Sequence, residues 1–254
     1  MSFFEKRGQL TSLILVGIII FIILAVVFYF FSVNSYKKEV MINSLEIPFK
    51  VEEIEDKINF CLKKITEEAI RTIHFNGGFI DLRNSPIGPL EVSSREEKSK
   101  IKTAWGLFEN EIVLISKEGL EYQLKEYLRY EVPICFSDKL PKNSIKQGYV
   151  GANVTVYNNL IDITLIYPVT IVIGDLNVKP KDEYKLKLNS NLGEMRYVPN
   201  EIVKQQREND GQIEIAKILS YGYDIRVLPV DETTSVILIY DKGQSGLIFM
   251  FGSK

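Results

Sequence analysis

The sequence predicts an α+β protein that is anchored at its N-terminal end by a transmembrane helix. Three observations support this fold class: an uncharged apolar stretch near the start, a long amphipathic helical pattern behind it, and a change to alternating periodicity near residue 148. We expect the second half to form a mainly antiparallel β-sheet. The expected segments are a cytoplasmic tip and anchor (1–32), a tether (33–50), a helical part of the ectodomain (51–147) and a mainly β part (148–254).

The apolar stretch runs from Leu10 to Phe31 and carries no charge. A helix needs about 20 apolar residues to cross the hydrocarbon core of a bilayer, whereas a core helix of a soluble protein is rarely apolar on every face. The stretch is longer than the apolar region of a secretory signal, and no small-residue cleavage site follows it. It therefore predicts a single-pass anchor that binds the lipid bilayer.

Charge does not decide the orientation of this anchor. Lys6 and Arg7 precede the span, and Lys37 and Lys38 follow it, so the positive residues are balanced. The orientation has to come from the cysteines discussed below.

A helix is predicted from Val51 to His74, because apolar residues recur there at spacings of three and four. Asn76, Gly77 and Gly78 should end it, since Asn and Gly tolerate the left-handed conformation beyond a helix end. Ser116 is a suitable N-cap for a second helix to about Glu131, closed by Pro133. Between the helices we expect strands over 79–82 and 106–115 and a loop over 84–102.

The β part begins with an alternating strand over 151–157, followed by Asn158-Asn159, where a tight turn would use the tolerance of Asn for positive φ. One long strand is then expected over 160–173. Pro168 lies inside it, so that strand should be an edge or carry a bulge. The remaining expected elements are strands over 183–188, 223–230, 235–240 and 247–251, a helix over 199–209 and a turn over 241–246.

Composition argues against several kinds of function. The net charge of −2 gives no indication of a nucleic-acid partner. One histidine and two cysteines exclude most metal sites built from those ligands, and no clustered carboxylate spacing suggests another. We predict no catalytic, cofactor-binding or metal-binding residues. His74 is expected to be structural, at the end of its helix, because a catalytic role would need a neighbouring nucleophile or carboxylate.

Cys61 and Cys135 are the chain's two cysteines. Two readings are open: a disulfide, as in many extracytoplasmic domains, or two buried free thiols. We favour the disulfide because each cysteine lies on or just after a predicted apolar helix. Asn153-Val154-Thr155 matches the N-glycosylation acceptor pattern, although such triplets also arise by chance. Tyr221 and Tyr223 could contribute to a partner surface or lie half-buried in strands.

The N-terminus resembles the class III signal of archaeal type IV pilin-like proteins. Lys6-Arg7-Gly8-Gln9 stands directly before the apolar run, and the resemblance implies cleavage between Gly8 and Gln9. Leu13 occupies the fifth position after that cleavage point, where pilins usually carry the Glu that helps one subunit register against the next. The alternative is that these residues are the polar flank of a signal anchor.

Most of the chain also resembles a group of uncharacterised archaeal single-pass membrane-anchored proteins. The motifs are a helix opened by Phe60-Cys61, the run from Phe75 to Ile80, a later cysteine at Cys135, and Tyr167-Pro168 in a hairpin strand. No activity comes with this resemblance.

We therefore expect a cell-surface structural or interaction protein with protein partners and no catalytic activity, and it could be pilin-like. The alternatives are an accessory subunit of an envelope or secretion complex and, less favoured, an anchored hydrolase.

Overall fold

The computed structural model describes residues 20–29, 51–93, 100–137, 145–173, 176–209, 211–241 and 248–254. The chain divides into two compact units, Met1–Glu53 and Ile54–Lys254. In the first unit, residues 20–29 form a helix with exposed side chains. The remainder of the predicted anchor and the tether over 33–50 lie outside the described residues. Within the described ranges, no helix combines the length and the apolarity that a membrane crossing requires.

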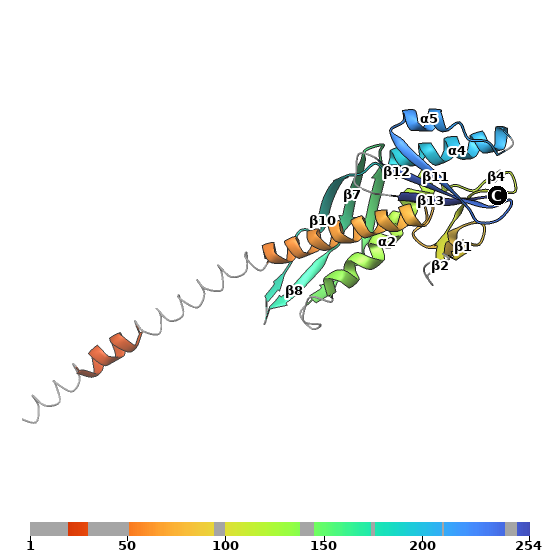
Figure 1. Cartoon of the computed structure of the whole chain (residues 1–254). Coiled ribbons are helices and arrows are strands. Elements are labelled where there is room, and N and C mark those ends of the chain that lie inside the picture. The colour runs from red at the N-terminus through yellow and green to blue at the C-terminus, as the bar shows by residue number, and fades with distance from the viewer. Residues whose placement is uncertain are drawn as a thin grey trace, which may run out of the picture. The chain divides into compact units, whose positions relative to one another are not determined.

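The second unit is α+β with mainly antiparallel strands, which confirms the predicted fold class for this part of the chain (Figure 1). Its helical elements are the helix over residues 51–75 from Ile54 onward, η1 (Leu82–Asn84), α2 (Lys117–Ser137), α3 (Leu192–Met195), α4 (Tyr197–Glu208) and α5 (Ile215–Ser220). Its strands are β1 (Leu90–Ser93), β2 (Lys100–Thr103), β3 (Trp105–Phe108), β4 (Glu111–Ile112), β5 (Ile145–Gln147), β6 (Gly151–Val156), β7 (Leu160–Ile166), β8 (Val169–Ile173), β9 (Leu176–Val178), β10 (Glu183–Asn189), β11 (Tyr223–Pro229), β12 (Ser235–Asp241) and β13 (Ile248–Ser253).

The helix over 51–75 forms as predicted, and its apolar stripe is the part that is buried. Ile58, Cys61 and Ile73 are fully buried within one core cluster. The glycines end the helix as expected: Gly77 has φ of 67°, and the N–H of Gly78 donates to the Ile73 carbonyl oxygen at 2.8 Å. A positive φ at this position costs Gly little, which explains why the helix ends here.

We call the helix over 51–75, α2 and the sheet β10–β7–β6 the helical layer. In Figure 1 both helices lie along one face of this sheet, and their apolar side chains share one core cluster with it. The central strand β7 alternates between buried and less buried side chains, with Ile161, Ile163 and Leu165 fully buried. Leu120, Leu124 and Leu128 of α2 provide the opposing surface.

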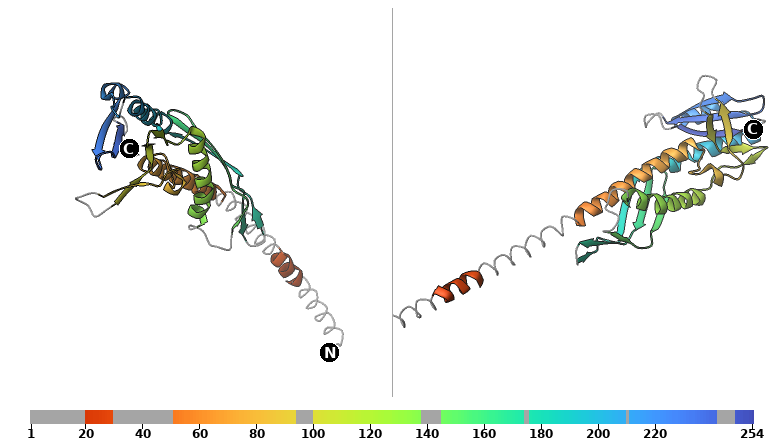
Figure 2. Two further views of the ribbon diagram at one scale, coloured as in Figure 1. Left: turned by 90° about the vertical axis from the view of Figure 1, so that its right-hand side faces the viewer. Right: turned by 90° about the horizontal axis from the view of Figure 1, so that it is seen from below.

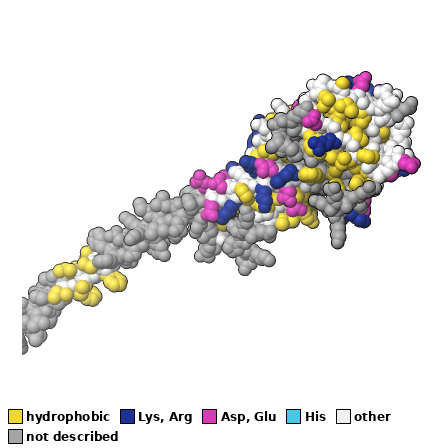
Figure 3. Space-filling model, viewed as in Figure 1, with side chains coloured by type: hydrophobic (Ala, Val, Ile, Leu, Met, Phe, Trp, Pro, Cys, Tyr) yellow, Lys and Arg dark blue, Asp and Glu magenta, His cyan; other side chains and the backbone are white. Residues whose placement is uncertain are grey.

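We call the five-stranded sheet β11–β12–β13–β3–β4 the C-terminal sheet (Figure 2). Among the described strands, β13 and β3 make the only parallel pair. Ile202 of α4 and Ile218 of α5 join the core cluster on one face, and Leu90 of β1 joins the cluster on the other. Hydrophobic side chains are also exposed around the part of the molecule where α5 and β11–β13 lie (Figure 3).

The region between the two helices differs from the prediction. Residues 79–82 form no strand, because the Asp81 side chain caps η1 by accepting the Arg83 N–H at 2.9 Å. The predicted loop over 84–102 contains β1 and most of β2, which pair antiparallel and are joined by an ion pair of 2.5 Å between Glu91 and Lys102. The predicted strand over 106–115 is instead a hairpin of β3 and β4.

Helix α2 does not end at Pro133 as predicted but continues to Ser137. Ser116 does cap it, since its Oγ accepts the Gly119 N–H at 3.0 Å. Proline inside a helix costs about 3 kcal/mol because it removes one backbone hydrogen bond. Val132 and Phe136, both fully buried, extend the leucine stripe at the same spacing and offset that cost.

The predicted strand over 160–173 is two strands in different sheets, separated at Tyr167-Pro168, and the expected edge or bulge is wrong. The turn at Asn158-Asn159 is present, but without the expected positive φ. Glu109 and Asn110 adopt positive φ instead, at 50° and 72°, in the β3–β4 turn.

The strands predicted over 183–188, 223–230, 235–240 and 247–251 and the helix over 199–209 are confirmed as β10, β11, β12, β13 and α4, with small shifts at their ends. The turn predicted over 241–246 falls almost wholly outside the described residues. The division at residue 147 stays a prediction; β3, which precedes it, pairs with β13, which follows it.

Candidate interaction surface

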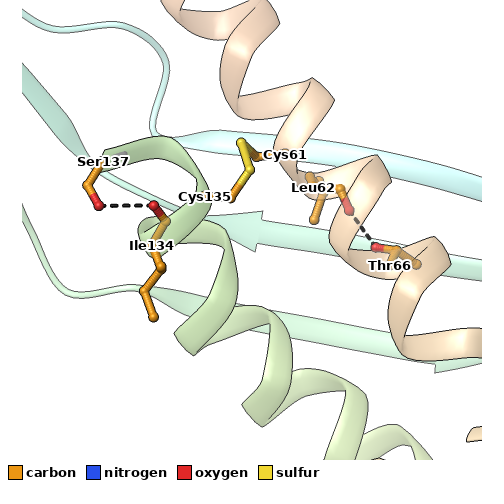
Figure 4. The surroundings of a disulfide bond; sticks show 6 residues. All are labelled: Cys61, Leu62, Thr66, Ile134, Cys135 and Ser137. Atoms are coloured by element: carbon orange, nitrogen blue, oxygen red, sulfur yellow. Dashed lines mark hydrogen bonds between the residues drawn. A yellow bond between two sulfur atoms is a disulfide. The ribbon is translucent and has the colours of Figure 1, made fainter. Parts of the chain in front are cut away.

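The predicted disulfide is present. Cys61 lies near the middle of the helix over 51–75 and Cys135 near the end of α2, with their Cα atoms 5.9 Å apart (Figure 4). This separation falls within the range of about 4.4–6.8 Å that a disulfide requires. The alternative of two free thiols is therefore wrong. The bond joins the two helices where both face the core.

The other predicted positions are scattered over the molecule. Gly8 and Gln9 lie outside the described residues. Asn153 is exposed on β6, so the amide of the acceptor triplet is accessible. His74 is fully buried at the end of its helix, with its ring centroid 6.2 Å from that of Phe249. In the described ranges, no group of three or more His, Cys, Asp or Glu could hold a metal ion.

The outer side of α2 carries exposed tyrosines. Tyr122 and Tyr130 are 63% and 75% exposed, and both belong to the helix face opposite the buried leucines. Tyr149, which precedes β6, is 74% exposed, and its hydroxyl accepts a 2.7 Å hydrogen bond from Arg129. The same guanidinium donates to Glu126 at 2.7 Å and to the Val150 carbonyl oxygen at 3.0 Å. Arg129 therefore holds Tyr149 against α2.

A groove of about 740 Å³ lies between α2 and residues 80–84. The two sides are tied together, because the Ile80 N–H donates to Gln123 Oε1 of α2 at 2.9 Å. Tyrosines and carboxylates line this groove: Asp81, Tyr122, Glu126, Tyr127, Tyr130 and Glu131. We call these six residues the tyrosine groove.

Two of the three carboxylates of the tyrosine groove are paired with arginines, Asp81 with Arg83 and Glu126 with Arg129. Arg83 pairs with Asp81 through its Nε at 2.9 Å, and this hydrogen bonding lowers the pKa of the Asp81 carboxyl. Burial, assisted by nearby carboxylates, raises the pKa of the Tyr127 hydroxyl, so this tyrosine stays neutral and can donate a hydrogen bond. Aromatic rings next to hydrogen-bonding groups suit a polar protein partner, because tyrosine combines a large contact area with a polar tip.

Two adjoining hollows of about 400 and 570 Å³ surround the Asn158-Asn159 turn. Tyr197 lines both, Lys117 and Arg196 line the smaller, and Tyr221 lines the larger. Tyr221 is 48% exposed whereas Tyr223 is buried, so only Tyr221 of the two predicted surface tyrosines is available to a partner.

Known proteins offer no guide to this surface. Comparisons with protein-family models, curated proteins and solved structures found no match. The functional argument therefore depends on the residues themselves.

Sequence reasoning missed the tyrosine groove, although one signal was available. Tyr122, Glu126 and Tyr130 recur every four residues and so had to share a helix face. The contribution of residues 80–84 had no such signal, because these residues meet α2 only through tertiary contacts such as the hydrogen bond from the Ile80 N–H to Gln123.

Proposed function

We propose that this protein is membrane-anchored, that its α+β domain lies outside the cytoplasm, and that it binds other proteins through the tyrosine groove without catalysing a reaction. The observation that carries the proposal is the Cys61–Cys135 disulfide, which links the two helices of the core. Disulfides form and persist in oxidising compartments, whereas the cytosol keeps thiols reduced.

The stretch from Leu10 to Phe31 supports the anchor. It is uncharged throughout, and its described portion, residues 20–29, is helical with exposed apolar side chains. Exposed Ile, Phe and Val side chains are costly in water and favourable in lipid. A domain tied to such a helix would reach its partners at the membrane surface.

The tyrosines support protein binding. Tyrosine is enriched at protein interfaces, where it contributes much buried area at a low cost in side-chain entropy. Tyr122 and Tyr130 stay exposed while the opposite face of α2 is buried. These rings make no contribution to the core that would explain their presence.

Topology can be tested on intact host cells by adding protease and labelling thiols before and after reduction. We expect digestion of the domain without lysis, and labelling of Cys61 and Cys135 only after reduction. Protection from protease, with both thiols labelled at once, would show an inward-facing domain and reject the proposed location. Carbonate extraction tests the anchor, and release of the full-length chain would contradict it.

Partner binding can be tested by replacing Tyr122 or Tyr130 with a photoreactive phenylalanine in the host. We expect a discrete cross-linked product from both positions. Glu232, in the exposed β11–β12 turn, is the matched control and should give none. Equal products at all three positions, or none at the two tyrosines, would remove the tyrosine groove from the proposal.

A pilin-like role is the second candidate, and Lys6-Arg7-Gly8-Gln9 is the observation that favours it. It requires a mature N-terminus at Gln9, which mass spectrometry of the native protein measures, together with filaments on cells. An intact N-terminus combined with co-purification of a membrane complex favours the accessory-subunit alternative.

A further inference from the structure

Strand β11 is the open edge of the C-terminal sheet, since β12 is its only partner among the described strands. Backbone groups of successive residues face opposite sides of an antiparallel strand. The Val230 N–H donates to the Thr234 carbonyl oxygen at 2.8 Å, on the β12 side. By alternation, the peptide groups of Arg226 and Leu228 also face β12. Those of Ile225 and Val227 point away from the sheet.

This edge exposes apolar side chains on both faces. Val227 is 45% exposed on the face shared with α5, and Leu228 is 47% exposed on the other. Leu219 and Tyr221, just before the strand, are 42% and 48% exposed. Gly222 has open space around its Cα, so the approach to the start of the strand is clear. Proteins usually cover such edges, because an unpaired strand attracts another one.

Strand β11 is self-complementary in charge, so two copies of it can pair antiparallel with opposite charges facing each other. Asp224 and Arg226 flank Ile225, and all three belong to one continuous strand. We infer that β11 pairs antiparallel with β11 of a second copy of this chain, with the two Ile225 residues directly opposite each other. Asp224 of each copy then faces Arg226 of the other, and opposite charges at such cross-strand positions are stabilising.

Other registers fit less well. Centring the pair on Asp224 or on Arg226 places like charges opposite each other, and centring it on Val227 places Arg226 opposite Leu228. Pro229 has no N–H, and alternation directs its backbone to the open edge. Pairing therefore stops before Pro229, which also favours a centre in the first half of the strand.

In the chosen register the paired residues are 223–227 of each copy, and Leu228 lies just beyond them, beside the turn that contains Gly222 of the second copy. Antiparallel pairing keeps corresponding faces of the two sheets on the same side, so the exposed Val227, on the face shared with α5, is brought towards Leu219 in α5 of the second copy. This inference does not depend on the location or the anchor proposed above, and it uses a surface separate from the tyrosine groove.

Cysteine cross-linking of the full chain in its membrane tests the register. The native cysteines are bonded to each other, so an Ile225→Cys variant carries one free thiol. Opposed residues in a hydrogen-bonded antiparallel pair have Cα atoms about 5.5 Å apart, within disulfide range. Mild oxidation should therefore give a reducible species of twice the 29.1 kDa chain mass.

Leu228→Cys is the matched control. In this register the two copies of residue 228 lie six positions apart along the strands, or about 20 Å, so that variant should not cross-link. Equal cross-linking at both positions would show unspecific collision and overturn the register. Cross-linking of Ile225→Cys to a different protein, with no homodimer, would overturn the assignment of a second copy.

Charge reversal provides a test that does not use cysteine. Asp224→Arg or Arg226→Asp places like charges opposite each other twice in the dimer, which should weaken association roughly tenfold or more. The double variant restores opposite charges and should recover it, as measured by sedimentation of the full chain in detergent. If none of the three variants changed dimerisation, the dimer would be held by another surface, for example the anchor, and the inference would be overturned. A wild-type chain that sediments as a monomer would also overturn it.

Discussion

The helical layer and the C-terminal sheet bury apolar surface to different degrees. In the helical layer, Leu124, Leu128 and Ile163 are fully buried, and a disulfide joins the two helices. The C-terminal sheet is closed on both faces near its centre but ends in β11, where Val227 and Leu228 remain exposed. The helical layer is stabilised by contacts within the chain, whereas the C-terminal sheet leaves apolar surface available to another chain.

The difference follows from how each sheet meets its neighbours. The edge strand β6 of the helical layer is covered by α2, whose Glu121 accepts the Val156 N–H at 2.8 Å. Within the described part of the chain, strand β11 is contacted by α5 on one face and pairs only with β12, so its outer edge has no equivalent cover there. A covered edge contributes to folding stability, and an open edge contributes to association.

The largest expected effect is removal of the disulfide in a Cys61→Ala/Cys135→Ala variant. The bond spans 74 residues, so the chain-entropy estimate is a loss of about 4 kcal/mol in unfolding free energy. Urea denaturation of the full chain in detergent measures this loss. Reducing the wild type should lower its midpoint similarly and leave the variant unaffected. An unchanged midpoint would mean that the helical layer does not depend on the bond.

Paired leucine truncations compare the two regions directly. Leu124→Ala should cost about 2–5 kcal/mol because it leaves a cavity in the helical layer. Leu228→Ala removes the same atoms from a side chain that is 47% exposed in the single chain, so at concentrations too low for copies to associate it should change stability by no more than about 0.5 kcal/mol. Urea denaturation of both variants measures the two changes in unfolding free energy. Similar losses would contradict the contrast.

Gly193 in α3 lies at the junction of the two regions. A Cβ at this position would collide with the Tyr157 carbonyl oxygen, because α3 packs against the Asn158-Asn159 turn. We expect Gly193→Ala to cost about 1–3 kcal/mol. Gly88→Ala is the matched control, since nothing lies within 4 Å of its added Cβ. Thermal unfolding compares the two, and equal shifts would argue against a tight junction.

Two buried tyrosines lower the stability of the helical layer. The hydroxyls of Tyr167 and Tyr184 are buried without a hydrogen-bond partner within the described ranges, and burial raises the pKa of both. Tyr167→Phe and Tyr184→Phe should therefore be neutral or stabilise the fold by up to about 1–2 kcal/mol. Tyr130→Phe, on the exposed surface, should change nothing. A clear destabilisation in the unfolding curve would reveal a partner for these hydroxyls.

The smallest effect concerns pH. Glu55 accepts the Lys181 N–H at 3.1 Å and pairs with the Lys181 ammonium at 3.2 Å, and the backbone hydrogen bond chiefly lowers the pKa of its carboxyl. A carboxyl whose pKa is lower in the folded state stabilises the fold at pH values above its unfolded-state pKa. This stabilisation is lost as the pH falls through its folded-state pKa. Glu55→Gln should cost about 0.5–1 kcal/mol at pH 7.

That difference in stability should vanish well below pH 4.5, where the Glu55 carboxyl of the wild type is protonated and therefore uncharged, like the Gln amide. Glu183→Gln, which breaks an exposed pair with Lys185, serves as the control and should have no measurable effect at any pH. A cost for Glu55→Gln that persists in acid would have a cause other than the charge.

The sequence by itself determined the features whose signals lie within one turn or one strand. The stripe of the helix over 51–75, its end at Gly77, the Ser116 cap and the alternation of β7 all follow from residues close together in the chain. The pairing of Cys61 with Cys135 was also predictable, because the chain has two cysteines, each beside an apolar helical face.

Only the tertiary structure decided the features that depend on distant residues. Helix α2 continues past Pro133 because Val132 and Phe136 are buried in the core. The expected strand over 160–173 is divided because its two parts pair in different sheets. The tyrosine groove and the open edge of β11 arise in the same way. Local periodicity is set by neighbouring residues, whereas the free energy that selects a partner comes from surfaces that meet only in the folded chain.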